Sequence, residues 1–325
     1  MQDYISIQYL RAVAALMVVA YHILTANLVK YDGETGWLAG GVDIFFVISG
    51  FIMVQSTRDR DYSPAQFYAR RIIRIVPIYW IATLAVIQNM QWEWVHAVKS
   101  FFFIPYLNPE TQNFMPILQP GWTLNFEMFF YLIFGFSLLL REKFRFFAVA
   151  VCLIVLVSVG LVFKPAGAPG FYTNPIMLEF LLGMFIARFG IRLPFLCAPI
   201  AILAIPFLWE AVDHRELSLG LPAAIIVASS LTVDTKIPKL PFLLRLGDAS
   251  YAIYLFHLSA LGLVAALLGP YAIPPFVMIL AGLMMASLAG LSIHHFIEIP
   301  MNGFLKGLYV RKMERRPIKQ SVTNI

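Results

Sequence analysis

The fold of this chain is indicated first by residues 5–22, which read ISIQYLRAVAALMVVAYH and open an apolar run that continues to residue 27. A run of this length crosses a bilayer as a helix. Arg11 and His22 interrupt it, and at about 100° per residue both lie within roughly 20° of one helix face, about 16 Å apart along the axis. Ionisable side chains in a membrane helix cost about 2.5–3.5 kcal/mol each on insertion scales and mark a candidate functional site.

The composition is that of a membrane protein. Of 325 residues, 60% are hydrophobic and 13% are charged, and the mean hydropathy is +0.77. Soluble domains carry about 25% charged residues. Apolar windows therefore predict an all-α integral membrane protein with about ten transmembrane helices. The predicted spans are residues 5–27, 38–56, 73–90, 121–140, 145–163, 173–189, 194–211, 216–233, 248–269 and 274–297. Segment 92–118, rich in aromatic residues and proline, is expected to form an interfacial or re-entrant loop on the outer face.

The basic residues predict how these spans are oriented. Most lie in one set of alternate loops and in the C-terminal segment, and the other loops hold only Lys30, Lys99, Lys164 and Arg215. Because cytoplasmic loops carry the excess of Lys and Arg, both termini are predicted to be cytoplasmic. The same distribution explains the net charge of +6 without a nucleic-acid partner. Residues 1–305 are expected to form the transmembrane domain, and residues 306–325 a basic cytoplasmic tail along anionic lipid head groups.

The orientation places His22 and Asp43 at similar depth near the outer side, on helices joined by a short loop. If the Asp43 carboxylate accepts a hydrogen bond from one ring nitrogen of His22, the other nitrogen is free to act as a base or to carry a group itself. The alternative is a structural hydrogen bond between two packed helices. Glu127, predicted in the outer half of its span, either lines the same cavity or pairs with a nearby basic residue.

A second cluster lies where the third span leaves the cytoplasm. Arg70, Arg71 and Arg74 are three and four residues apart and form one cationic helix face. These arginines either only keep this end of the span in the cytoplasm, or they also form a clamp that binds phosphates of a cytosolic donor. The two interpretations are compatible. Arg11, in the inner half of the first span, would extend this clamp into the membrane.

Other histidines carry weaker signals. His257, near mid-membrane in span 248–269, is either a packing residue with its hydrogen bonds satisfied or part of the site, and both interpretations stay open. His294 and His295 are adjacent and point to different helix faces, which argues against a helical metal pair. No metal site is expected.

Five segments, in order, resemble the motifs of a known family. They are ISIQYLRAVAALMVVAYH with its Arg and His, GGVDIFFVISGF at 40–51, YARRIIRIVPIYW at 68–80, GWTLNFEMFFY at 121–131 and SYAIYLFH at 250–257. Apolar strings match by chance, so each segment alone is a weak signal, whereas all five in sequence are specific. Over roughly residues 4–305, the chain resembles the acyltransferase-3 family of bacterial membrane O-acyltransferases, in particular the exopolysaccharide and O-antigen acetyltransferases.

The resemblance implies a function and a set of residues. The donor would be a cytosolic acyl-coenzyme A, usually acetyl-CoA, with no permanently bound cofactor. The acceptor would be a hydroxyl of a surface polysaccharide or of its lipid-linked precursor, reached from the bacterial cytoplasmic (inner) membrane. Whether the catalytic histidine is itself acylated or acts as a base stays open. The residues implied are Arg11, Arg71 and Arg74 for donor phosphates, and His22, Asp43 and Glu127 for catalysis along a passage through the bundle.

Two other function classes are compatible with the sequence. Buried charges also fit a transporter or flippase for a glycan or small molecule, although the repeat symmetry and broken helices of such proteins are not recognisable here. The third class is a non-catalytic partner of polysaccharide-assembly proteins. Some relatives carry an extra hydrolase-like domain outside the membrane that completes the transfer. We expect direct transfer in this chain, or completion by a separate protein.

Overall fold

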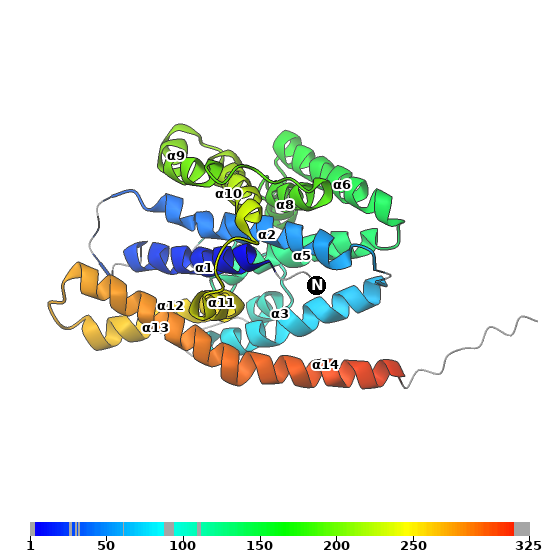
Figure 1. The fold of residues 1–325 in the computed structure, drawn as a ribbon. Helices are drawn as coiled ribbons and strands as arrows, with labels where there is room; N and C mark the ends of the chain where they lie inside the picture. Colours follow the sequence, from blue (N-terminus) through cyan, green and yellow to red (C-terminus); the bar gives the residue numbers. More distant parts are fainter. Residues whose placement is uncertain are drawn as a thin grey trace, which may run out of the picture.

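The computed structural model describes residues 4–314 apart from 26, 27, 30, 32, 61, 88–93 and 109–111, and within that part the regular secondary structure is helical (Figure 1). The longer helices are α1 (Ile5–Thr25), α2 (Gly40–Thr57), α3 (Pro64–Ile87), α5 (Gly121–Ser137), α6 (Glu142–Phe163), α8 (Met177–Phe189), α9 (Cys197–Ala211), α10 (Leu221–Val233), α12 (Ser250–Leu268), α13 (Pro275–Ile293) and α14 (Ile299–Glu314). Shorter elements are η1 (Gly36–Ala39), α4 (Trp94–Phe101), α7 (Gly167–Tyr172), η2 (Glu216–Gly220), α11 (Pro241–Asp248) and η3 (His294–Glu298).

Among the described residues, seven helical segments are long and apolar enough to cross a membrane. They are Ile5–Thr25, Gly36–Thr57, Glu142–Phe163, Gly167–Phe189, Glu216–Val233, Ser250–Leu268 and Pro275–Arg311. The remaining predicted spans also form helices, but α5 has 17 residues, α9 has 15, and α3 carries three arginines. The prediction of an all-helical, multi-pass membrane protein is therefore confirmed, with seven of the predicted spans meeting both the length and the hydropathy expected of a transmembrane helix.

Two regions differ from the predicted boundaries. The expected loop 92–118 contains the eight-residue helix α4 before it becomes irregular. The last predicted span does not end at residue 297, because the π-helical turn η3 joins α13 to α14 in one helix along the lower edge of Figure 1. Pro300 lacks the N–H that an α-helix needs, and the wider turn before it accommodates the lost hydrogen bond. The predicted tail beyond Glu314 lies outside the described residues.

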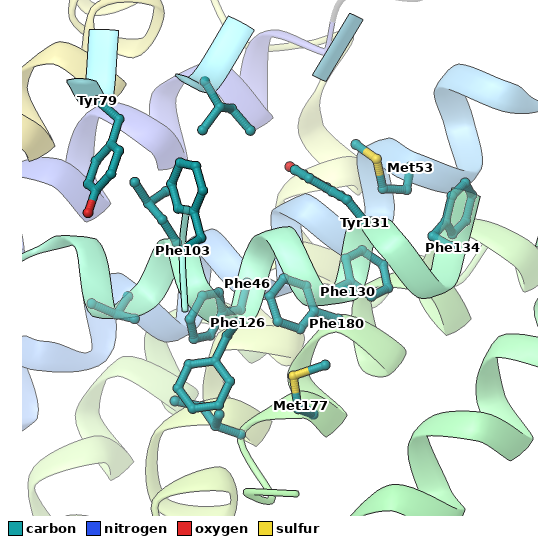
Figure 2. Close-up of a cluster of buried hydrophobic side chains, with 14 of the residues drawn as sticks. Phe46, Met53, Tyr79, Phe103, Phe126, Phe130, Tyr131, Phe134, Met177 and Phe180 are labelled. Carbon is teal, nitrogen blue, oxygen red and sulfur yellow. The ribbon is translucent and has the colours of Figure 1, made fainter. Parts of the chain in front are cut away.

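An aromatic core joins three central helices (Figure 2). The ring of Phe180 on α8 packs against Phe46 of α2 and Phe130 of α5, with centroids 4.7 and 4.4 Å apart. Such ring pairs contribute about 0.5–1.5 kcal/mol each beyond the area they bury. Because α2 and α5 carry Asp43 and Glu127, this core fixes the helices on which two of the predicted site residues lie.

Glycines allow α2 and α8 to approach closely. A Cβ atom on Gly183 of α8 would lie 1.9 Å from the carbonyl oxygen of Val47, and one on Gly50 of α2 would lie 2.0 Å from that of Phe180. No side chain fits at either position without separating the backbones. Small residues at helix contacts are a common means of close packing within membranes.

Gly183→Ala is therefore expected to lower the stability of the protein in detergent by about 1–3 kcal/mol, because the added methyl group separates α2 from α8. Gly262→Ala is the matched control, since nothing lies within 4 Å of a Cβ atom there and alanine favours a helix. The measurement is thermal unfolding, with the folded protein that remains after heating quantified by size-exclusion chromatography. Equal midpoints for the two variants would contradict the close contact.

Candidate active site

A cavity of about 420 Å³ opens among α1, α2, α3, α5, α12 and the α13–α14 helix. Four of the six predicted site residues line it: Arg11, Arg71, Arg74 and Glu127. Neither His22 nor Asp43 is among its lining residues. Its further polar lining includes Ser49, Tyr131, Tyr251, Tyr254, Asn302 and Lys306. The structure thus brings the predicted donor-binding arginines together with Glu127 and separates them from the other two candidates.

The cavity arginines have few protein partners. Arg11 donates a hydrogen bond from Nη1 to Gln8 Oε1 at 3.0 Å. The guanidinium of Arg71 lies 5.7 Å from the ring centroid of Tyr131, and its buried Nε has no hydrogen-bond partner. Within the described part of the chain, no carboxylate lies within 4.0 Å of Arg11, Arg71 or Arg74. Cations without an ion pair on a cavity wall suit an anionic ligand.

Glu127 is held by hydroxyl groups. Its Oε1 accepts a hydrogen bond from Ser49 Oγ at 2.9 Å and a short one from the hydroxyl of Tyr131. The residue is half-buried on α5 and faces the arginine cavity. Of the two interpretations open from the sequence, the structure supports a cavity-lining role. The cavity is the arginine cavity, however, rather than one shared with His22.

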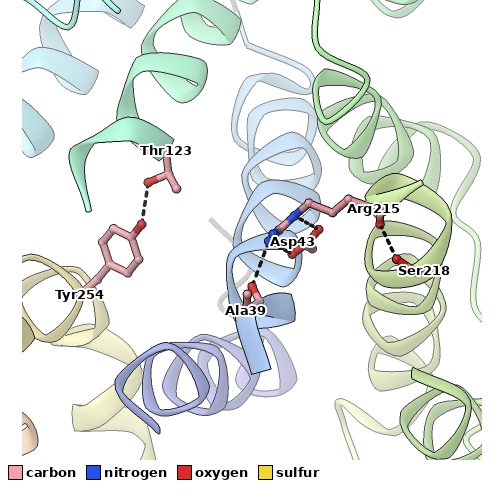
Figure 3. A network of polar contacts seen from close by, with 6 residues as sticks. All are labelled: Ala39, Asp43, Thr123, Arg215, Ser218 and Tyr254. Atoms are coloured by element: carbon pink, nitrogen blue, oxygen red, sulfur yellow. Dashed lines mark hydrogen bonds and ion pairs between the residues drawn. The ribbon is translucent and has the colours of Figure 1, made fainter. Parts of the chain in front are cut away.

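The predicted hydrogen bond between Asp43 and His22 is wrong. Asp43, which is 0% exposed, pairs instead with Arg215, just before η2 (Figure 3). Arg215 Nε donates to Oδ1 at 3.1 Å, and Nη2 donates to Oδ2 at 2.6 Å and to the Ala39 carbonyl oxygen at 3.2 Å. A guanidinium offers two parallel charged donors, so it is a stronger partner for a buried carboxylate than a neutral imidazole.

His22 has a different partner, which is a second histidine. Its Nδ1 lies 2.9 Å from the Val18 carbonyl oxygen and 3.1 Å from Nε2 of His257 on α12. His257 is 0% exposed, and its Nδ1 lies 2.7 Å from the Tyr254 carbonyl oxygen. His22 itself is half-buried.

Tyr254 connects the arginine cavity to this histidine pair. It lines the cavity and precedes His257 by one helical turn. Its hydroxyl lies 2.8 Å from Thr123 Oγ1 and 3.0 Å from the Pro120 carbonyl oxygen at the start of α5 (Figure 3). Polar side chains therefore follow one another from the cavity to His22, although neither His22 nor His257 lines the cavity.

The remaining candidates of the sequence lie at the other end of the cavity. On η3, His294 Nδ1 lies 2.8 Å from Glu298 Oε2, and both residues line the cavity. The described residues contain no group of three or more His, Cys, Asp or Glu side chains placed to hold a metal ion. The pair is a local polar contact between the first and last residues of the π-helical turn.

Comparisons with known proteins identify the family of this chain. The sequence model of a family described as "Acyltransferase domain" matches residues 4–295. The chain therefore belongs to the acyltransferase-3 family, and it is a membrane acyltransferase.

Three relatives illustrate the range of the family. The exopolysaccharide production protein ExoZ of Rhizobium meliloti is 38% identical over 255 residues, which cover 70% of this chain and 78% of the relative. The acyltransferase MdmB of Streptomyces mycarofaciens is 26% identical over 301 residues, covering 78% and 77%. The peptidoglycan O-acetyltransferase OatA of Listeria monocytogenes is 28% identical over 165 residues, covering 42% and 24%. No solved structure matches the chain.

Proposed function

We propose that this acyltransferase moves an acyl group, with acetyl as the first candidate, from cytosolic acyl-CoA to a hydroxyl of a surface polysaccharide or of its lipid-linked precursor. The observation that carries the proposal is the cavity with three arginines that make no ion pair with any described residue, together with a histidine pair on two of the helices that line it. The names of ExoZ and OatA support a polysaccharide acceptor and an O-acetyl product, respectively.

The lining of the cavity supports a donor of this chemistry. Its volume of about 420 Å³ lies in the range of small-molecule sites. Buried polar atoms are nearly always paired, yet Arg71 Nε and Asn302 Oδ1 on its wall are not. A donor with phosphate and amide groups would supply both partners. Arg11, Arg71 and Arg74 would engage its phosphates, and the acyl end would reach toward Tyr254.

His22 would act on the acceptor. In one route the sugar hydroxyl attacks the thioester carbonyl, its proton passes to a ring nitrogen of His22, the carbon–sulfur bond breaks and the CoA thiolate is protonated. In the other, the ring nitrogen attacks the thioester carbonyl and expels the CoA thiolate; the sugar hydroxyl then attacks the acylated ring, the nitrogen–acyl bond breaks to restore the imidazole, and the hydroxyl proton passes to the thiolate. Glu127 would line the donor's passage. Asp43 would act at a distance, by fixing the start of α2 through Arg215.

The same proposal sets the protein in its membrane. The positive-inside distribution supports cytoplasmic termini, which puts Arg71 on the donor side and His22 on the outer side. Counting α3, α5 and α9 with the seven spans above gives ten crossings, an even number, as two termini on the same side require. The bacterial relatives support a place in the cytoplasmic (inner) membrane.

Arg71→Ala is expected to weaken binding of acetyl-CoA about ten- to hundredfold, because a charged hydrogen bond contributes about 1.5–3 kcal/mol. Arg70→Ala is the matched control, because Arg70 is exposed on the same helix, bonds to the Tyr62 hydroxyl at 2.5 Å and does not line the cavity. Calorimetry on the detergent-purified proteins measures both affinities. If the two variants bind equally, the arginine cavity is not the donor site.

The function is tested in a strain that lacks this protein, by NMR of its surface polysaccharide. Loss of the acyl ester with polysaccharide still present is the expected result. Loss of the polysaccharide itself would favour the transporter or flippase. In the matching assay, the purified protein should transfer label from radioactive acetyl-CoA to isolated polysaccharide.

A further inference from the structure

The contact between His22 and His257 determines where the protons lie. The two rings are 4.8 Å apart at their centroids, with Nδ1 of His22 facing Nε2 of His257 at 3.1 Å. A neutral imidazole has one donor nitrogen and one acceptor nitrogen. The backbone carbonyls beside each ring, which can only accept, show which nitrogen is which.

On His257, Nδ1 lies 2.7 Å from the Tyr254 carbonyl oxygen and must therefore carry the hydrogen. Its Nε2 then has no hydrogen and directs a lone pair at His22. On His22, Nδ1 lies 2.9 Å from the Val18 carbonyl oxygen and must carry a hydrogen as well. That hydrogen is shared between the Val18 oxygen and the lone pair of His257, and the unprotonated nitrogen of His22 is Nε2.

The arrangement is also directional. A proton added to His257 would point two N–H groups at each other across 3.1 Å. A proton added to Nε2 of His22 leaves the contact intact, because Nδ1–H still meets a lone pair. The pair therefore accepts a proton at His22 and excludes one at His257.

We propose that His257 is the positioning residue of this enzyme: it fixes His22 in the tautomer whose Nε2 is free to receive a proton or an acyl group. This inference rests on the proposed function of His22. His257 takes the place that a carboxylate holds beside many catalytic histidines. A neutral ring suits its position, since His257 is 0% exposed and a charge there would be far from water.

Kinetics of two substitutions test the role. His257→Leu fills the space but accepts no hydrogen bond, and we expect kcat to fall about 10–100-fold with the KM for acetyl-CoA unchanged. His257→Gln offers an amide oxygen to Nδ1–H of His22 and should recover most of the loss. His214→Leu is the control, because His214 is 63% exposed. Wild-type kcat in His257→Leu, or equal losses in the Leu and Gln variants, would overturn the proposal.

A second measurement requires neither an activity assay nor a substitution at His257. The chain has 6 histidines, so nitrogen NMR of ¹⁵N-histidine protein in nanodiscs resolves few rings, and His22→Ala identifies the signals of His22. We expect a protonated Nδ1 and a bare Nε2 on that ring. The opposite tautomer would refute the inference even if His22 is catalytic. Full transfer by His22→Ala would instead refute the proposed function and leave the tautomer to be judged by NMR alone.

Discussion

Replacing His22 by alanine is expected to lower kcat for acyl transfer about 10²–10⁴-fold, the usual contribution of a general base. The substitution removes the ring nitrogen that we propose receives the proton or the acyl group. It should leave acetyl-CoA affinity unchanged, because His22 does not line the arginine cavity. The measurement is the ester content of the polysaccharide together with donor binding to the purified variant.

The control for this experiment is His214→Ala. His214 is 63% exposed and lies 3.4 Å from Glu216 outside the cavity, so its loss should change neither ester content nor donor binding. Normal ester in the His22→Ala strain would end the catalytic assignment. A loss of donor binding together with the ester would mean that His22 supports the fold of the cavity rather than the chemistry.

Arg215→Ala is expected to destabilise the protein by about 3–5 kcal/mol, because it leaves the carboxylate of Asp43 buried without its cation. Asp43 is 0% exposed, so its carboxylate has no access to water once the guanidinium is removed. The measurement is the thermal midpoint in detergent. We expect the variant to melt well below the wild type.

The two members of this pair should not be equivalent. The Arg215 side chain is 29% exposed and can turn toward water, so Asp43→Asn should be milder than Arg215→Ala. The double variant Asp43→Asn with Arg215→Gln keeps hydrogen bonding without charge and should recover much of the stability. If Arg215→Ala melts like the wild type, the ion pair does not hold η2 to α2.

The helical spans could be predicted from the sequence for a physical reason. A membrane span must satisfy its own backbone hydrogen bonds, so each appears as one apolar helical run. Arg11, Arg71 and Arg74 were all predicted toward one side of the membrane, and they do meet in one cavity. Glu127 was predicted in the outer half of its span yet lines the same cavity, so position along a span did not show that they would meet.

The sequence did not reveal how each helix is rotated about its own axis, and therefore which neighbour each side chain faces. Asp43 was predicted at the depth of His22, but α2 is apolar nearly all round, so no polar stripe indicates which neighbour the carboxylate faces. Arg215 begins the helical segment that continues through η2, and nothing in its local sequence pairs it with a residue so distant in the chain. His257 had one usable signal, an ionisable residue in an apolar span, which by itself points to function.

The hydroxyl contact between Tyr254 and Thr123 has a consequence for the transfer that we propose. Both residues line the arginine cavity, whereas His22 and His257 do not. If acyl-CoA binds in the cavity as proposed, its acyl group must pass about one helical turn of α12, about 5 Å, between Tyr254 and His257 to reach the histidine pair.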